Sequence, residues 1–141
     1  MKRFITYFLI LVSAFSYGQN KGIIIGTFGE KQTPKEIEGC SSFFYLSESD
    51  KKLNKYLYVN DFAQTSFIKI NNQLVKFTLI KNYPVGKTDV YLYKSGNTQL
   101  KVEVKTKKAT GDENMVVSGT ITVQDQYGKK IALNFIGDSG C

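Results

Sequence analysis

Residues 99–107 read Gln-Leu-Lys-Val-Glu-Val-Lys-Thr-Lys, and they carry the clearest strand pattern in the chain. Apolar and charged residues alternate along it. One side carries Leu100, Val102 and Val104, and the other carries Lys101, Glu103 and Lys105. A period of two places successive side chains on opposite faces, which indicates a β-strand with one buried and one solvated face.

Similar but shorter apolar runs precede and follow this stretch, at intervals of roughly 8–12 residues. Gly, Asn, Asp and Ser separate them, and no amphipathic helix pattern interrupts the series. The expected strands cover residues 23–25, 42–46, 56–59, 66–70, 74–80, 89–94, 115–123 and 130–135. The sequence therefore predicts an all-β fold, an antiparallel β-sandwich or a small β-barrel of about 8–9 short strands.

One hairpin can be predicted in detail. The runs at residues 66–70 and 74–80 flank Asn71, Asn72 and Gln73. Asparagine tolerates the left-handed backbone conformation that tight hairpin turns require. We therefore expect the two runs to pair across Asn71 and Asn72.

The first nineteen residues have the pattern of a secretory signal peptide. Lys2 and Arg3 precede an apolar run at residues 4–12, and small residues follow up to Gln19. The run is too short to span a bilayer, although an uncleaved anchor is the alternative interpretation. The expected organisation is a signal peptide at 1–19, an N-terminal strand and linker at 20–39, and a single all-β domain at 40–141. This predicts a secreted or periplasmic protein with no transmembrane segment in the mature chain.

The chain has two cysteines, Cys40 and Cys141. Export leads to an oxidising compartment, where two cysteines favour one intramolecular disulfide. An intermolecular bridge or a free thiol remains open. A Cys40–Cys141 bond would tie the last residue of the chain to the start of the predicted domain.

The segments around both cysteines carry a resemblance. Residues 38–46 (Glu-Gly-Cys-Ser-Ser-Phe-Phe-Tyr-Leu), 55–62, 67–71 and 137–141 (Gly-Asp-Ser-Gly-Cys) resemble, in order and spacing, a group of small exported bacterial proteins of unknown function, of the Bacteroidota type. The resemblance covers about residues 38–141. It implies an exported all-β protein and adds no activity.

The composition argues against several kinds of chemistry. The chain has no histidine, which excludes Ser-His and Cys-His catalytic pairs and histidine metal ligands. Neighbouring carboxylates such as Glu48 and Asp50 fall in predicted loops, where solvated acids are the rule. The glycines between residues 22 and 29 lack the Lys-Ser/Thr ending of a phosphate loop. We therefore expect no enzyme activity, no metal and no cofactor.

The charge is moderately basic. Removing residues 1–19 takes away Lys2 and Arg3 and no acid. The mature chain then keeps seventeen of the 19 cationic residues and all 12 acidic ones, so its net charge is +5. Such a charge favours anionic surfaces and polymers. The expected partner is an anionic envelope component or a protein, and export argues against nucleic acid.

Two sets of side chains are candidate binding surfaces. The first is cationic, on one strand face and the loop after it: Lys101, Lys105, Lys107 and Lys108. Its alternative interpretation is a solvated face that prevents edge-to-edge aggregation. The second is aromatic, and it consists of two same-face pairs: Tyr56 with Tyr58, and Tyr91 with Tyr93. Its alternative interpretation is burial inside a small barrel.

The sequence as a whole predicts a non-enzymatic secreted or periplasmic β-domain that binds a ligand or an envelope or protein partner. The alternative is an inhibitor of a secreted hydrolase. Small disulfide-stapled β-barrels that inhibit lysozyme are similar in size and compartment to this chain.

Overall fold

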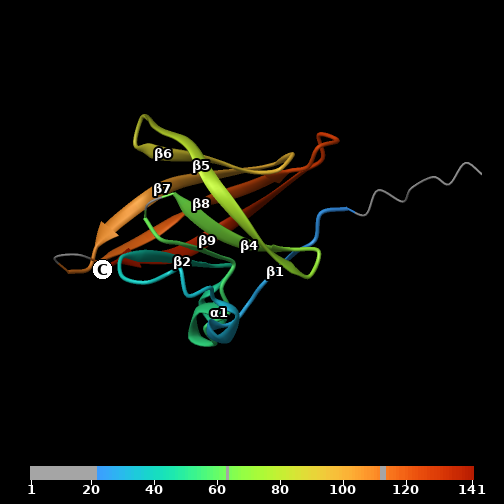
Figure 1. Cartoon of the computed structure of the whole chain (residues 1–141). Helices are drawn as coiled ribbons and strands as arrows, with labels where there is room; N and C mark the ends of the chain where they lie inside the picture. The colour runs from blue at the N-terminus through green and yellow to red at the C-terminus, as the bar shows by residue number, and fades with distance from the viewer. Residues whose placement is uncertain (1–21, 63, 112–113) are drawn as a thin grey trace, which may run out of the picture.

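The computed structural model describes residues 22–62, 64–111 and 114–141 (Figure 1). The predicted signal peptide and its cleavage site lie outside the described residues. Within the described part of the chain, no helix has the length and apolar character needed to cross a membrane.

Eight strands form a closed antiparallel barrel, which confirms the barrel form of the predicted fold. Each strand from β2 to β9 pairs with the next one along the chain, and β9 pairs with β2 to close the sheet. The strands are β2 (Ser41–Tyr45), β3 (Tyr58–Asn60), β4 (Thr65–Ile70), β5 (Gln73–Val85), β6 (Thr88–Ser95), β7 (Thr98–Ala109), β8 (Met115–Gln124) and β9 (Lys130–Gly140). A further short strand, β1 (Ile25–Gly26), pairs with the end of β4.

The β4–β5 hairpin is confirmed. Its two turn residues, Asn71 and Asn72, have φ angles of 48° and 67°. Two consecutive residues with positive φ make the turn whose twist matches that of the paired strands. The Asn71 side chain also accepts a hydrogen bond from the Ile24 backbone N–H at 3.0 Å, which fixes the start of β1 against the turn.

Strands β5 and β7 are longer than expected, with 13 and 12 residues, and each contains a bulge. The register shifts between Leu79 and Lys81 in β5 and between Val104 and Thr106 in β7. Gly119 of β8 lies opposite Val104, and a Cβ atom there would collide with the Glu103 carbonyl. Only glycine therefore allows β7 and β8 to approach each other so closely beside the bulge.

Aromatic rings and aliphatic side chains pack together in the barrel interior. Phe44 stacks on Phe135 with ring centroids 4.0 Å apart, and on Tyr58 at 4.7 Å. Gly137 pairs with Phe44 across the β2–β9 seam, where a Cβ atom would collide with the Phe44 ring. The glycine thus leaves room for the ring stack that occupies the middle of the barrel.

The segment before β2 packs on the outside of the barrel. Phe28 bridges to Tyr56 and, with Val59 and Phe67, forms a second buried cluster on the outer surface of β3 and β4. Residues that the sequence assigns to a linker therefore contribute a packed layer. They include the single-turn helix η1 (Glu30–Gln32).

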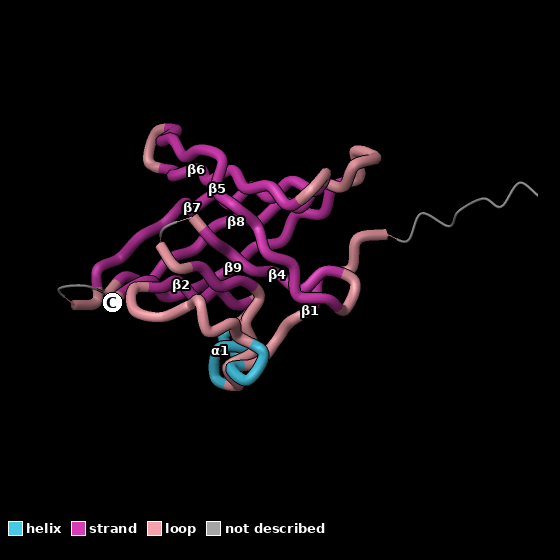
Figure 2. Tube along the Cα trace, in the orientation of Figure 1, coloured by secondary structure: helices cyan, strands magenta, loops and turns pink. Residues whose placement is uncertain are grey.

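The connection between β2 and β3 contains the short helix α1 (Glu48–Lys52), which lies beside the barrel (Figure 2). The Ser47 hydroxyl caps it by accepting a hydrogen bond from the Asp50 backbone N–H at 3.1 Å. Lys51 forms a 3.1 Å ion pair with Asp138 of β9, which fixes the helix against the seam.

The predicted disulfide is present between Cys40 and Cys141. Cys40 precedes β2 and Cys141 follows β9, and Ser41 pairs directly with Gly140. The covalent bond therefore joins the two strands whose pairing closes the barrel, and it holds the chain terminus that would otherwise fray.

The disulfide should supply a large share of the stability. Replacing Cys40 and Cys141 by serine is expected to lower the free energy of unfolding by about 4 kcal/mol, because the bond closes a loop of about 100 residues in the unfolded chain. Urea unfolding followed by circular dichroism measures the loss. Wild-type protein in reductant serves as the control and should match the double variant. A loss below about 1 kcal/mol would contradict the assigned role.

Candidate functional site

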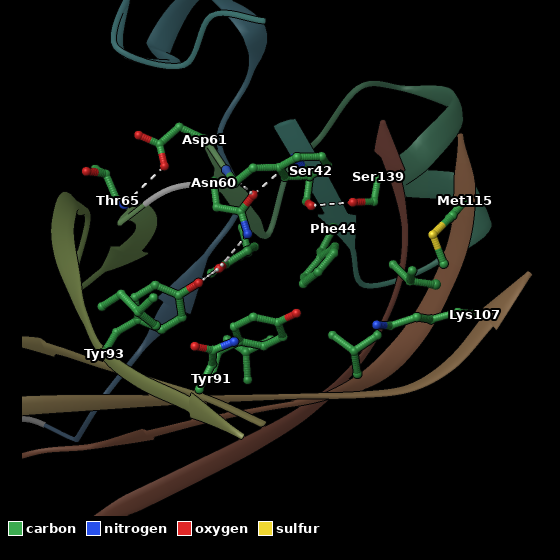
Figure 3. Close-up of a pocket in the computed structure, with 17 residues that line it drawn as sticks. Ser42, Phe44, Asn60, Asp61, Thr65, Tyr91, Tyr93, Lys107, Met115 and Ser139 are labelled. Atoms are coloured by element: carbon green, nitrogen blue, oxygen red, sulfur yellow. Dashed lines mark hydrogen bonds between the residues drawn. The ribbon is translucent and has the colours of Figure 1, made fainter. Parts of the chain in front are cut away.

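A cavity of about 450 Å³ lies inside the barrel at the end that carries the disulfide (Figure 3). Ser42 and Ser139 line it, each two residues from a cysteine. Phe62 and Lys107 also line it and are exposed, so the cavity opens to solvent at this end. Eight-stranded barrels have an interior just wide enough for side chains or for one small ligand.

One wall of the cavity is polar. Ser139, Ser42, Asn60 and Ser66 face one another in a single register row across β9, β2, β3 and β4. The Ser42 and Ser139 hydroxyls are 2.7 Å apart and share a hydrogen bond. The Asn60 side-chain oxygen accepts from the backbone N–H groups of Ser42 and Phe62, both at 3.2 Å.

Asn60 connects this row to a buried pair of tyrosines. Its amide nitrogen donates to the Tyr58 hydroxyl at 3.0 Å, and the Tyr58 hydroxyl donates to the Tyr93 hydroxyl at 2.9 Å. The hydrogen bonds drawn in Figure 3 run from Ser42 through Asn60 toward Tyr93. Polar groups from β2, β3 and β6 are therefore held in one network.

The part of the lining from β7, β8 and the end of the inward run of β5 is apolar. Val102 and Val104 of β7 and Val117 of β8 are buried, and Met115 and Leu79 contribute half-buried side chains. The lining is thus amphipathic, because it combines hydroxyl and amide groups from β2, β3 and β9 with aliphatic groups from β7 and β8.

The two bulges direct further polar side chains into the cavity. Residues 75, 77 and 79 point inward before the β5 bulge, whereas Asn82 pairs with Tyr91 and lines the cavity after it. In β7 the inward positions are 100, 102 and 104 before the bulge, but Lys107 pairs with the inward-facing Val117 after it. Bulges commonly reorient side chains next to functional sites in this way.

Lys107 does not act as an isolated charge. Its ammonium group forms an ion pair with the Asp89 carboxylate of β6, and both side chains are about one third exposed (37% and 36%). In Figure 3 the Lys107 side chain points toward Tyr91.

The predicted cationic surface is not one face, and this prediction needs correction. Lys101 and Lys108 occupy outward positions, Lys105 is the bulge residue and Lys107 lines the cavity. Lys101 also lies 3.5 Å from Glu103, which offsets its charge. The prediction assumes that inward and outward side chains alternate without interruption along β7. The bulge at Lys105 reverses this alternation and so places the four lysines on different sides of the strand.

The aromatic prediction holds only in part. Tyr58, Tyr91 and Tyr93 come together in the barrel, as the burial interpretation expects, and all three line the cavity. Tyr56 does not share a face with Tyr58. It lies in the outer cluster, with its ring 4.9 Å from that of Phe43. The period of two fails here because β3 begins only at Tyr58.

The buried tyrosines keep their protons at neutral pH. Burial is the largest cause that raises the pKa of Tyr58 well above 10, and burial also raises the pKa of Tyr93. Burial raises the pKa of Tyr45, on the outer cluster, to about 12. Tyr58 and Tyr93 therefore act as hydrogen-bonding phenols rather than as bases or nucleophiles near neutral pH.

Ser42, Asn60, Asn82 and Ser139 are site residues that the sequence analysis missed. Each is polar and lies close to a strand end, where polar residues ordinarily indicate a turn. The sequence contains one signal for the β7 bulge. Gly119 lies in the middle of a predicted strand, and a glycine at such a position often marks a bulge or a close approach of a neighbouring strand.

Comparison with family models, with curated proteins and with solved structures finds no match to this chain. The site therefore has to be interpreted from its own chemistry. Among the residues described by the structure, no three His, Cys, Asp or Glu side chains are grouped as a metal site requires. The arrangement offers hydrogen bonds and apolar contacts, which are the means of holding a small molecule.

Asn60 should be essential for the polar wall. Replacing Asn60 by alanine removes three hydrogen bonds and leaves two backbone N–H groups and a buried phenol without this partner. The expected loss in the free energy of unfolding is about 2–4 kcal/mol. Replacement of Asn97, an exposed turn residue, by alanine is the control and should change it by less than about 0.5 kcal/mol. Urea unfolding measures both losses, and equal losses for the Asn60 and Asn97 variants would contradict the role assigned to Asn60.

The raised tyrosine pKa values predict alkaline sensitivity. A group whose pKa is higher in the folded state stabilises that state below the pKa of the unfolded chain, near 10, and this stabilisation falls as the pH rises above that value. At pH 11, unfolding in guanidinium should therefore increase phenolate absorbance at 295 nm, as Tyr45, Tyr58 and Tyr93 become exposed and ionise. An absorbance that does not rise on unfolding would show that these phenols are already ionised in the folded protein.

Proposed function

We propose that this chain is an exported, non-enzymatic binding protein that holds a small amphipathic molecule in the cavity at the disulfide end of the barrel. The observation that carries the proposal is the cavity itself. Its volume of about 450 Å³ falls within the range of roughly 300–1,000 Å³ typical of ligand pockets. Its lining combines apolar side chains with a few positioned polar groups, which is the usual composition of such pockets.

The chemistry of the lining favours binding over catalysis. The chain has no histidine to act as an acid or base near pH 7. Tyr58 and Tyr93 have raised pKa values, so neither supplies a phenolate at that pH. Lys107 is engaged in an ion pair with Asp89.

Two features support export. The first nineteen residues have the pattern of a signal peptide. The Cys40–Cys141 disulfide is compatible with an oxidising compartment outside the cytoplasm. An anionic envelope component or a protein partner stays a prediction from the sequence, as does the inhibitor of a secreted hydrolase.

Binding can be tested with an uncharged fluorescent dye of suitable size. Prodan, a naphthalene ketone, should bind the mature protein at one site, with a blue-shifted emission. Met115→Trp should reduce its affinity at least about tenfold, because the larger ring occupies the mouth of the cavity. Val116→Trp is the matched control: the position is adjacent, but Val116 faces outward and is 37% exposed.

The comparison of the two tryptophan variants decides the proposal. Circular dichroism first establishes that both variants fold. Prodan binding that survives in Met115→Trp and is lost in Val116→Trp would place the site outside the barrel and overturn the proposal. Absence of dye binding to the wild-type protein would also overturn it.

A further inference from the structure

The polar wall of the cavity has a fixed hydrogen-bond direction. The oxygen of the Asn60 side chain is occupied by two backbone N–H groups, so the amide nitrogen must be the atom that faces Tyr58. An amide nitrogen only donates, and Tyr58 therefore accepts from it. The Tyr58 hydroxyl in turn donates a hydrogen bond to the Tyr93 oxygen at 2.9 Å.

Tyr93 is the end of this chain of donors. Its oxygen accepts from Tyr58, so its own O–H points elsewhere, and Tyr93 lines the cavity. Ser42 and Ser139 have two hydroxyl protons and share one hydrogen bond, which leaves a second donor on the same wall. The wall thus presents hydrogen-bond donors to the cavity. A ligand that fits this wall must carry a hydrogen-bond acceptor.

The charges at the cavity argue against an ionic ligand. Lys107 is ion-paired with Asp89, and among the described residues that line the cavity the ionisable carboxylate is that of Asp61. A bound carboxylate would therefore lose its hydration without gaining an uncompensated cation, and the Asp61 carboxylate would repel it. A bound ammonium group would face hydroxyl donors, because the Asn60 oxygen and the Asp61 carboxylate already accept hydrogen bonds from backbone N–H groups.

We infer that the ligand is an electrically neutral amphiphile whose polar end is a carbonyl or ester oxygen, which accepts the Tyr93 hydroxyl proton while its apolar body lies against Val102, Val104 and Val117. This inference rests on the proposed function and specifies its ligand class. Tyr93 is the residue that selects the polar end, and the valines of β7 and β8 receive the rest of the molecule.

The test compares three probes with similar apolar chains and different polar ends: 2-nonanone, octanoate and octylammonium. Each competes with Prodan for the mature protein at pH 7.4. The ketone should displace the dye at a concentration at least about tenfold lower than either ion, which corresponds to about 1.4 kcal/mol. Equal or stronger displacement by octanoate or octylammonium would overturn the inference.

A substitution isolates the role of Tyr93. Tyr93→Phe removes the hydroxyl and keeps the ring, and it should weaken 2-nonanone about tenfold while leaving octanoate and octylammonium unchanged. Tyr83→Phe is the control, because Tyr83 faces outward and is 38% exposed. The double variant Ser42→Ala/Ser139→Ala, which removes both serine hydroxyls and with them the second donor, should weaken the ketone less than Tyr93→Phe does. It also tests the polar wall if Tyr93→Phe fails to fold.

The outcomes separate the two proposals. If Prodan and all three competitors fail to bind, the proposed function is wrong. If Prodan binds but Tyr93→Phe affects the ketone and octanoate equally, the barrel binds small molecules and only the inference about the polar end is wrong.

Discussion

The barrel is closed by the pairing of β2 with β9. These strands lie at opposite ends of the described domain, and their backbone hydrogen bonds convert a meander of eight strands into a closed barrel. Closure sets the interior width, so the choice of inward side chains decides how much of the interior is filled. Phe44, Phe135 and Tyr58 fill the middle, whereas Ser42 and Ser139 leave space next to the disulfide.

The two bulges convert that space into a site. Without them, the strict alternation of β5 and β7 would keep Asn82 and Lys107 on the outer surface. Gly119 allows the β7 bulge because any side chain there would meet the Glu103 backbone. A local irregularity in the sheet thus determines which polar groups face the cavity, and the regular strands supply its apolar lining.

Much of the fold could be predicted from the sequence, because alternation, turn residues and cysteine count are local signals. They correctly predicted the all-β class, the hairpin at Asn71 and Asn72, and the disulfide. The site could be predicted less well. Its polar row depends on the register between strands distant in sequence, and the position of Lys107 depends on a bulge that alternation does not encode. Tyr58 and Tyr93 were recognised as candidates, but their hydrogen bond is a consequence of barrel closure.

The central claim is that the barrel interior at the disulfide end receives the apolar body of a neutral ligand. Methyl NMR on valine-labelled mature protein tests it most directly, during titration with 2-nonanone. The methyl signals of Val102, Val104 and Val117 are expected to shift together, whereas those of the outward-facing Val85 and Val116 should not shift. Shifts confined to Val85 and Val116, with the three inward valines unchanged, would contradict it.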